Sequence, residues 1–349
     1  MQNVIDLTEV SKLKKLLEGS RRVALTGHRA PDGDALGSCL GMARVLRGMG
    51  KDARVFTPDE PPHYLRILPG AREVMAWSSF GIKAENWIKN ADVVLCMDYN
   101  APSRVDRLAP AILESHGTLV LIDHHEAPED FTALKFSLPA LSSTSELTAR
   151  LLMALGWWER VDRETADCLM GGILTDTGGF RYNSSDPELY SIVGALLEKG
   201  ADKDRLVRCL IQTKSENAIR LESFALAERM EVFPEHHAAL LVLDVPDLNR
   251  FGYKKGDTEG LVNRPLEIPG IVYVVYLRQE REYVKVSARS IGDFPVNQIC
   301  ARYYSGGGHI NAAGGEFRGT MQECIQVFKD TLNDNLKIMS EKALKAATR

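Results

Sequence analysis

The sequence lacks any apolar run long enough to span a bilayer, and it contains no internal repeat or low-complexity tract. It also lacks an excess of positive charge, because 43 Lys and Arg residues stand against 47 Asp and Glu residues, for a net charge of −4. Without a global basic field, long duplex nucleic acid is excluded as a partner, and any nucleic-acid substrate should be short. The stretch from Met1 to Leu17 has no signal-like apolar segment. We therefore expect a cytoplasmic protein that does not bind membranes.

Closely spaced cysteines are absent as well. The six cysteines are widely scattered, and no pair has the spacing of a zinc site or a redox motif. Several lie in apolar runs, where cysteine packs as a small core residue, so we expect reduced thiols. With 349 residues, of which 44% are hydrophobic and 26% charged, the chain is long enough for two ordinary globular domains.

Short apolar runs alternate with amphipathic stretches through the first 200 residues. We expect strands at 22–26, 53–57, 92–97 and 118–122, and helices at 8–18, 35–49, 143–155, 163–174 and 186–199. This alternation predicts an α/β fold, with a mostly parallel sheet and helices on both faces. Gly37 and Gly41 share one helix face, which would let the helix at 35–49 lie close against the sheet.

The pattern changes after a charged helical stretch that ends near Met230. Beyond it we expect strands at 238–244, 271–277 and 283–289, helices at 296–304 and 320–338, and a glycine-rich loop at 305–315. The predicted organisation is a first domain at 1–202, a helical connector at 203–231 and a smaller α/β domain at 232–340.

Four apolar segments each run directly into groups that can bind a metal ion. They lead to His28, Asp32 and Asp34, to Asp98, to Asp123, His124 and His125, and to Asp176. Such runs are typical of buried parallel strands, and ligands bind beyond the carboxyl ends of strands in open α/β sheets. If these groups meet, the repulsion among the carboxylates favours cations between them. The chemistry indicated is metal-assisted attack of water on a phosphate ester.

Each segment taken alone has a simpler explanation. The run from His28 to Asp34 is also typical of a surface turn, Asp98 of a helix N-cap or loop acid, and Asp176 of a turn after a helix. Two adjacent histidines at a strand end are harder to explain structurally. We interpret His124 as a metal ligand and expect His125 to point elsewhere, toward substrate.

Together the motifs resemble the DHH/DHHA1 phosphoesterase family, named for Asp-His-His. HRAPDGDALGS at 28–38, MDYN at 97–100, IDHH at 122–125 and TDTGGF at 175–180 occur in the family's order, and SGGGH at 305–309, followed by AAGG at 312–315, resembles its second-domain signature. Within the family the chain is most similar to the stand-alone nano-RNase and pAp-phosphatase branch, the NrnA-like proteins. Neither the additional nucleic-acid-binding domains nor the upstream membrane and sensor domains of other branches are expected.

The resemblance implies two manganese ions, with magnesium and zinc as the open alternatives. It assigns His28 and Asp32 to one ion and Asp98 to both, and it assigns the other ion to Asp34, His124 and Asp176. Asp98, His124 and His125 would form the catalytic group.

The resemblance also implies substrate-binding residues in the second domain, namely Arg289, Gly306, Gly307, Gly308 and His309. Consecutive glycines let backbone N–H groups surround an anion, and an imidazole adds a donor that is charged near neutral pH. The simpler alternatives are a connecting loop and a surface arginine.

The activity that the resemblance implies is a two-metal phosphohydrolase for short oligoribonucleotides and for the mononucleotide bisphosphate 3′-phosphoadenosine-5′-phosphate (pAp). The alternatives are a phosphodiesterase for linear or cyclic dinucleotides such as pApA, an exopolyphosphatase-like enzyme, and a non-catalytic nucleotide sensor. A sensor would be marked by the loss of a ligand, and all six are present. A homodimer is the default oligomeric expectation.

Overall fold

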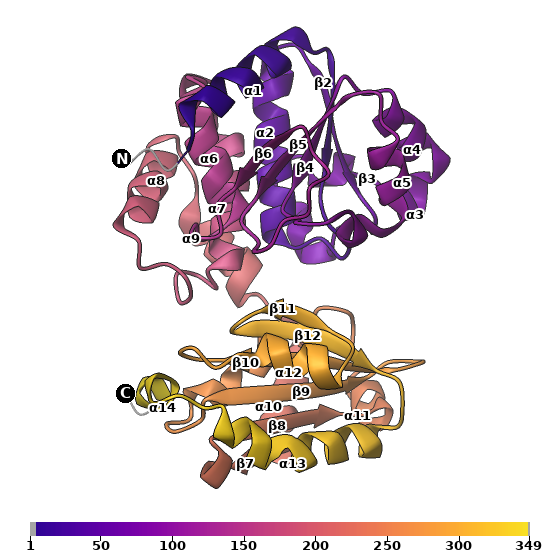
Figure 1. Ribbon diagram of the computed structural model, residues 1–349, viewed down its shortest axis with the longest axis vertical. Coiled ribbons are helices and arrows are strands. Elements are labelled where there is room, and N and C mark those ends of the chain that lie inside the picture. The colour runs from indigo at the N-terminus through magenta and orange to yellow at the C-terminus, as the bar shows by residue number, and fades with distance from the viewer. Residues whose placement is uncertain (1–4, 348–349) are drawn as a thin grey trace. The chain divides into compact units, whose positions relative to one another are not determined.

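The computed structural model describes residues 5–347, and its contacts divide the chain into two compact units, with the boundary along the chain between Thr213 and Lys214. Both units have α/β architecture (Figure 1), as the alternation in the sequence predicted. The domain boundaries 1–202, 203–231 and 232–340 stay a prediction, and residues 1–4 of the first predicted domain lie outside the described residues.

The first unit is built on a six-stranded parallel sheet with the order β3-β2-β1-β4-β5-β6. The strands are β1 (Arg22–Thr26), β2 (Asp52–Thr57), β3 (Met75–Ala76), β4 (Val93–Met97), β5 (Thr118–Asp123) and β6 (Leu134–Ser137). The four strands expected from the sequence are confirmed. The two edge strands, β3 and β6, were not predicted because they are too short to show a clear period.

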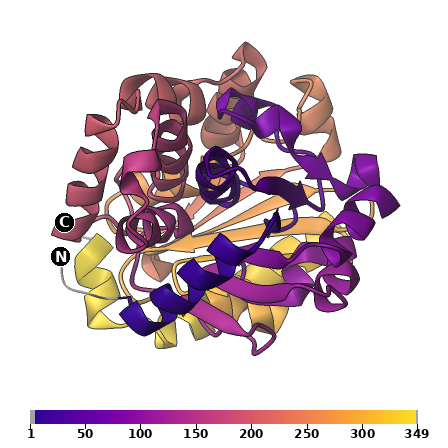
Figure 2. The same ribbon diagram turned by 90° about the horizontal axis from the view of Figure 1, so that it is seen from above.

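Helices cover both faces of this sheet because alternate residues of its strands face opposite sides. Val23 and Leu25 join one core with α1 (Leu7–Gly19), α2 (Gly33–Gly48), α6 (Thr144–Ala154), α7 (Arg163–Asp176) and α8 (Pro187–Glu198). Ala24 joins the other core, with α4 (Ile82–Lys89) and α5 (Ala109–Leu113), next to α3 (Trp77–Phe80). Helix α1, in indigo in Figure 2, packs against α6 and the edge strand β6.

Shorter helical segments complete the first unit. They are η1 (His63–Ile67), η2 (Ala71–Glu73), η3 (Pro102–Leu108), η4 (Trp158–Arg160), α9 (Lys203–Leu206) and the π-helix η5 (Val207–Gln212).

The prediction that Gly37 and Gly41 bring α2 close to the sheet is wrong, because both face α7. A Cβ atom at Gly37 would lie 2.5 Å from the carbonyl oxygen of Cys168, and one at Gly41 would lie 2.7 Å from the Leu169 side chain. Helix α2 is buried on nearly every side, so it has two packed faces. Its small residues serve the tighter helix–helix contact.

The second unit contains a mixed six-stranded sheet with the order β11-β12-β10-β9-β8-β7. The strands are β7 (Met230–Phe233), β8 (Ala238–Leu243), β9 (Tyr273–Gln279), β10 (Val284–Ser290), β11 (Gly307–His309) and β12 (Ala312–Phe317). Strands β8 and β9 pair in parallel, and the other neighbours pair antiparallel.

One face of this second sheet packs on α12 (Val296–Tyr303), α13 (Met321–Lys337) and α14 (Glu341–Ala347). The other face packs on α10 (Glu216–Glu228), α11 (Val245–Arg250) and η7 (Leu261–Glu267), and η6 (Pro234–His236) lies between β7 and β8.

The prediction of a glycine-rich loop at 305–315 is wrong. The segment forms a hairpin of β11 and β12 at the edge of the sheet. Glycine has a low preference for strands, so its density in the sequence favoured a loop. In the fold, a Cβ atom at Gly306 would lie only 1.9 Å from the carbonyl oxygen of Gly314. Glycine is therefore required for the close approach of the two chain segments.

All six cysteines are free, as expected. Five are buried, and Cys209, in η5, is partly exposed. Across residues 5–347, every helix is too short or too polar to cross a lipid bilayer.

Candidate metal centre

The connection from β1 to α2 and the first turn of α2 supply three of the predicted ligands, His28, Asp32 and Asp34. Asp32 caps α2, because its Oδ1 atom accepts hydrogen bonds of 3.0 Å from the backbone N–H groups of Asp34 and Ala35. Its other oxygen, Oδ2, lies 3.6 Å from Nε2 of His28. One oxygen of Asp32 thus caps the helix while the other faces the imidazole. The interpretation of this motif as a turn is therefore compatible with its interpretation as a metal site.

Asp98 follows β4 directly and adopts a left-handed backbone conformation, with φ of +64°. This conformation is uncommon outside glycine and is often found at functional sites. Its two carboxylate oxygens face different imidazoles. Oδ2 lies 3.5 Å from Nε2 of His28, and Oδ1 lies 3.7 Å from Nε2 of His124. Asp98 is therefore placed between two groups of ligands.

The position of Asp98 follows from the topology of the sheet. Strand β1 pairs with β2 on one side and β4 on the other, so the strand order reverses between β1 and β4. Ligands of doubly wound sheets bind at this reversal, beyond the carboxyl ends of the strands. The loops after β1 and β4 carry His28 and Asp98 to this place.

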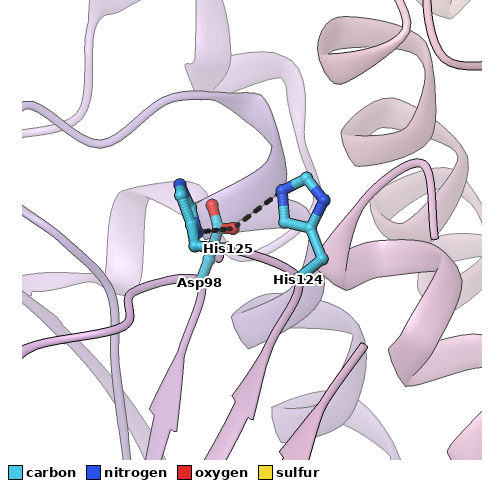
Figure 3. Close-up of side chains that lie close together, drawn as sticks. All are labelled: Asp98, His124 and His125. Carbon is cyan, nitrogen blue, oxygen red and sulfur yellow. Dashed lines mark ion pairs between the residues drawn. The ribbon is translucent and has the colours of Figure 1, made fainter. Parts of the chain in front are cut away.

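The histidines after β5 flank the Asp98 carboxylate, as Figure 3 shows. Nδ1 of His124 lies 3.3 Å from the carbonyl oxygen of Leu141, and Nδ1 of His28 lies 2.8 Å from that of Arg29. A carbonyl oxygen can only accept, so Nδ1 donates in both rings. The lone pair of each neutral ring then lies on Nε2, which faces the carboxylates. Ligating histidines are commonly oriented in this way.

His125 has a different partner. Its Nδ1 atom lies 2.7 Å from Oδ1 of Asp123 and 3.8 Å from Oδ1 of Asp98. Asp123 is completely buried at the end of β5. The resemblance assigns Asp123 neither to a metal ion nor to the catalytic group, although it is the first residue of the Asp-His-His motif. That position at the end of a buried strand was the available signal.

Asp176 is the last residue of α7, and its Oδ2 atom lies 3.4 Å from Nε2 of His124. The apolar run Gly172–Leu174 that precedes it is therefore part of a helix and does not follow the strand pattern of the other three segments. A short buried run cannot distinguish a strand from a buried helix. The Asp176 side chain is 30% exposed, compared with 1% for the Asp34 side chain.

The predicted ligands form two groups of three with Asp98 in contact with both. Among the described residues, ligand atoms of His28, Asp32 and Asp98 lie within 4.8 Å of one another, as do those of Asp34, His124 and Asp176. A third group, Asp98 with His124 and His125, overlaps both. The carboxylate and imidazole donors of these groups suit Mn²⁺ or Mg²⁺ better than a soft metal.

The electrostatics of the centre also fit cations. Burial raises the pKa of Asp34 well above its usual value, and the neighbouring Asp98 and Asp176 carboxylates raise it further. Partial burial and the carboxylates of Asp98 and Asp32 raise the pKa of Asp176 in the same way. These acids resist ionisation together, and a divalent cation among them would remove that repulsion.

The pKa values of Asp98 and His28 are shifted so that the carboxylate and the imidazole both favour their charged forms. Burial alone would raise the pKa of Asp98, but the imidazoles of His28, His125 and His124 outweigh it and lower the pKa. Burial likewise opposes the charged form of His28, but Asp32 and Asp98 raise its pKa well above the usual value. A cation that binds these side chains would therefore compete with protons for them.

The second unit brings Arg289 and His309 into one row of its sheet. Arg289 of β10 pairs with Ala312 of β12, and His309 of β11 pairs with the same alanine. Residues directly opposite in antiparallel strands project from the same face, so both side chains belong to one face of the sheet. Gly307 and Gly308 lie beside His309 in β11, and Gly306 precedes them.

Comparisons with known proteins match both halves of the chain to known domains. Residues 22–173 match the DHH family, N-terminal domain, and residues 237–337 match the DHHA1 domain. The chain is similar to the bifunctional oligoribonuclease and PAP phosphatase NrnA of Thermus thermophilus, with 31% identity over 89% of this chain and 88% of the relative. The protein of the same name from Bacillus subtilis is 28% identical over 84% and 88%.

A solved structure is similar over almost its whole length. It is that of an exopolyphosphatase-related protein from Bacteroides fragilis, with 38% identity and a TM-score of 0.95. The match covers 97% of this chain and 99% of that chain.

Proposed function

Because the chain belongs to the DHH/DHHA1 phosphoesterase family, we propose that it is a two-metal phosphohydrolase that cleaves short oligoribonucleotides and pAp. The observation that carries this proposal is the pair of ligand groups, His28 with Asp32 and Asp34 with His124 and Asp176, between which the Asp98 carboxylate lies, one oxygen near an imidazole of each group. The similarity to two proteins named for both activities supports the choice of substrates.

We assign His28 and Asp32 to one cation, Asp34, His124 and Asp176 to the other, and Asp98 to both, with Mn²⁺ as the expected metal and Mg²⁺ as the alternative. When bound, two such cations acidify a water molecule and offset the charge that develops on the phosphoryl oxygens. The protein's own contribution is a rigid set of donors. Backbone carbonyls hold the rings of His28 and His124 with Nε2 toward the centre.

His125 has the second catalytic role in this proposal. Asp123 binds Nδ1, which fixes the ring and keeps a proton on that nitrogen. We assign Nε2 of His125 to a phosphoryl oxygen of the substrate.

The second unit supplies the proposed substrate-binding residues. Arg289 and His309 lie on one face in the same row, so both can donate to one phosphate or ribose group. The backbone of Gly306, Gly307 and Gly308 would approach the same ligand closely. The net charge of −4 is compatible with a short substrate bound by such a local set of donors.

The test is hydrolysis of a substrate panel by the purified chain with added Mn²⁺. We expect mononucleotide release from a 5′-labelled RNA dimer and inorganic phosphate release from pAp. An Asp98→Ala variant should lose both activities by orders of magnitude, whereas a nucleotide sensor would lose only binding. Hydrolysis of pyrophosphate or polyphosphate, with RNA dimers and pAp left intact, would contradict the proposal.

The panel also includes pApA and polyphosphate, since the similar structure from B. fragilis is called exopolyphosphatase-related. A preference for pApA over both RNA dimers and pAp would assign the chain to dinucleotide turnover. Parallel titrations with Mn²⁺, Mg²⁺ and Zn²⁺ identify the metal, and size-exclusion chromatography with light scattering tests the expected homodimer.

A further inference from the structure

The first turn of α6 contacts two of the proposed metal-ligand carboxylates, although it contributes no ligand itself. The backbone N–H of Thr144 donates to Oδ2 of Asp34 over 2.6 Å, and that of Ser145 donates to Oδ1 over 2.8 Å. The hydroxyl of Thr144 donates to Oδ1 of Asp98 over 2.9 Å. Thr144 thus binds Asp34 and Asp98 simultaneously.

This turn is held in place by its own network of buried groups. The Ser143 side chain caps α6 by accepting from the backbone N–H of Glu146. The Glu146 carboxylate accepts from the backbone N–H and hydroxyl of Ser142 at 2.9 and 2.8 Å, and from the Arg150 guanidinium at 2.9 and 2.6 Å. All four residues are buried. The donors of the turn therefore have fixed positions before any ligand binds.

We propose that Thr144 is a positioning residue that sets the separation of the two proposed metal sites, an inference that rests on the proposed two-metal function. Its hydroxyl fixes the rotation of the Asp98 carboxylate, so that Oδ1 faces His124 and Oδ2 faces His28. Its backbone N–H fixes the Asp34 carboxylate, which belongs to the other group of ligands. Thr144 thus fixes Asp98, the ligand proposed for both sites, relative to Asp34, a ligand proposed for only one of them.

Burial alone does not explain the hydroxyl of Thr144. Thr148 lies one turn further along α6 and is equally buried, at 0% exposure, yet its hydroxyl has no hydrogen-bond partner within residues 5–347. Replacing Thr148 with valine removes a buried hydroxyl from the same helix without touching a carboxylate. It is therefore a matched control for the same change at Thr144.

The experiment compares the wild type with Thr144→Val, Thr144→Ala, Thr144→Ser and Thr148→Val. Calorimetric titration with Mn²⁺ in the absence of substrate gives the number and affinity of sites. We expect about a 10- to 100-fold weaker affinity for at least one Mn²⁺ in Thr144→Val and Thr144→Ala, the usual effect of removing a group that orients a ligand. With pAp, kcat should fall by a similar factor while KM changes little. Thr144→Ser should restore both values, and Thr148→Val should match the wild type.

Two results would overturn the inference. One is wild-type Mn²⁺ affinity and kcat in either hydroxyl-free variant of Thr144, with Thr144→Ala deciding if the valine variant does not fold. The other is an equal loss in Thr148→Val, which would indicate general packing in α6. A wild type that binds two Mn²⁺ ions but hydrolyses no member of the panel would contradict the proposed function alone, because the binding comparison is made without substrate.

Discussion

Replacing Gly37 with alanine should destabilise the first unit and weaken metal binding at its proposed metal centre. The added Cβ would lie 2.5 Å from the carbonyl oxygen of Cys168 and 2.9 Å from the backbone nitrogen of Gly172. Both are backbone atoms and cannot rotate away. Restoring an ordinary contact of 3.4 Å requires α2 and α7 to separate locally by 3.4 − 2.5 = 0.9 Å.

The energetic effect is the difference of two terms. Inserting a methylene-sized group into a packed core costs about 1–3 kcal/mol. Removing a glycine from a helix interior returns up to about 1 kcal/mol. We therefore expect the free energy of unfolding to fall by roughly 1–2 kcal/mol. Since α2 carries Asp34 and α7 carries Asp176, the separation also moves two proposed ligands apart, and Mn²⁺ affinity should fall.

The assay is urea denaturation followed by tryptophan fluorescence. All four tryptophans lie in the first unit, so the signal reports on that unit alone (Trp77, Trp87, Trp157 and Trp158). Gly194→Ala in α8 is the matched control, because nothing beyond the neighbouring residues and backbone of its own helix lies within 4 Å of the added Cβ. It should be neutral or stabilise by up to about 1 kcal/mol. A Gly37→Ala variant with wild-type stability and wild-type Mn²⁺ affinity would refute the packing argument.

Four further predictions concern the metal centre and the second unit. Asp98→Asn keeps a residue tolerant of the left-handed backbone but removes the charge of the ligand assigned to both cations. It should lower kcat on pAp by at least about 100-fold, the upper end of the loss seen when only a group that orients a ligand is removed. Chelation should abolish hydrolysis and lower the melting temperature of the first unit, and Mn²⁺ should restore both. Because the pKa values of Asp34, Asp176 and His28 are raised, protons compete with a cation for these groups, so Mn²⁺ should bind more weakly as pH falls. Calorimetry in buffers of different ionisation heat should detect proton release. Thr320→Ala removes the capping box of α13 and should destabilise the second unit by about 1 kcal/mol, seen by circular dichroism, with Mn²⁺ affinity unchanged.

The sequence contained enough information to predict the elements that carry the centre. Apolar runs marked β1, β4 and β5, and the rule for the carboxyl ends of parallel strands explains why His28, Asp98 and His124 were expected to meet. The structure brings these residues together. Their roles as metal ligands stay a proposal.

Other parts could not be predicted because they depend on contacts between distant segments. Thr144 lies 110 residues from Asp34 and 46 from Asp98, and a threonine at a helix start is ordinary in any sequence. The pairing of Gly307 with Gly314 depends on backbone approach, which no hydrophobic pattern records. The sequence could not show that Gly37 faces α7, because α2 is buried on two faces and the pattern does not tell which face is packed more closely.

The distribution of thiols gives the chain a practical property. Burial raises the pKa of Cys96, Cys300 and Cys324 to about 12, so these side chains are poor nucleophiles at neutral pH. Cys209, by contrast, is partly exposed, a few residues before the boundary at Lys214. A maleimide dye should therefore attach at this one place in the native protein. The sequence is thus already suited to the attachment of one spectroscopic label near the boundary between its two units, with no cysteine added or removed.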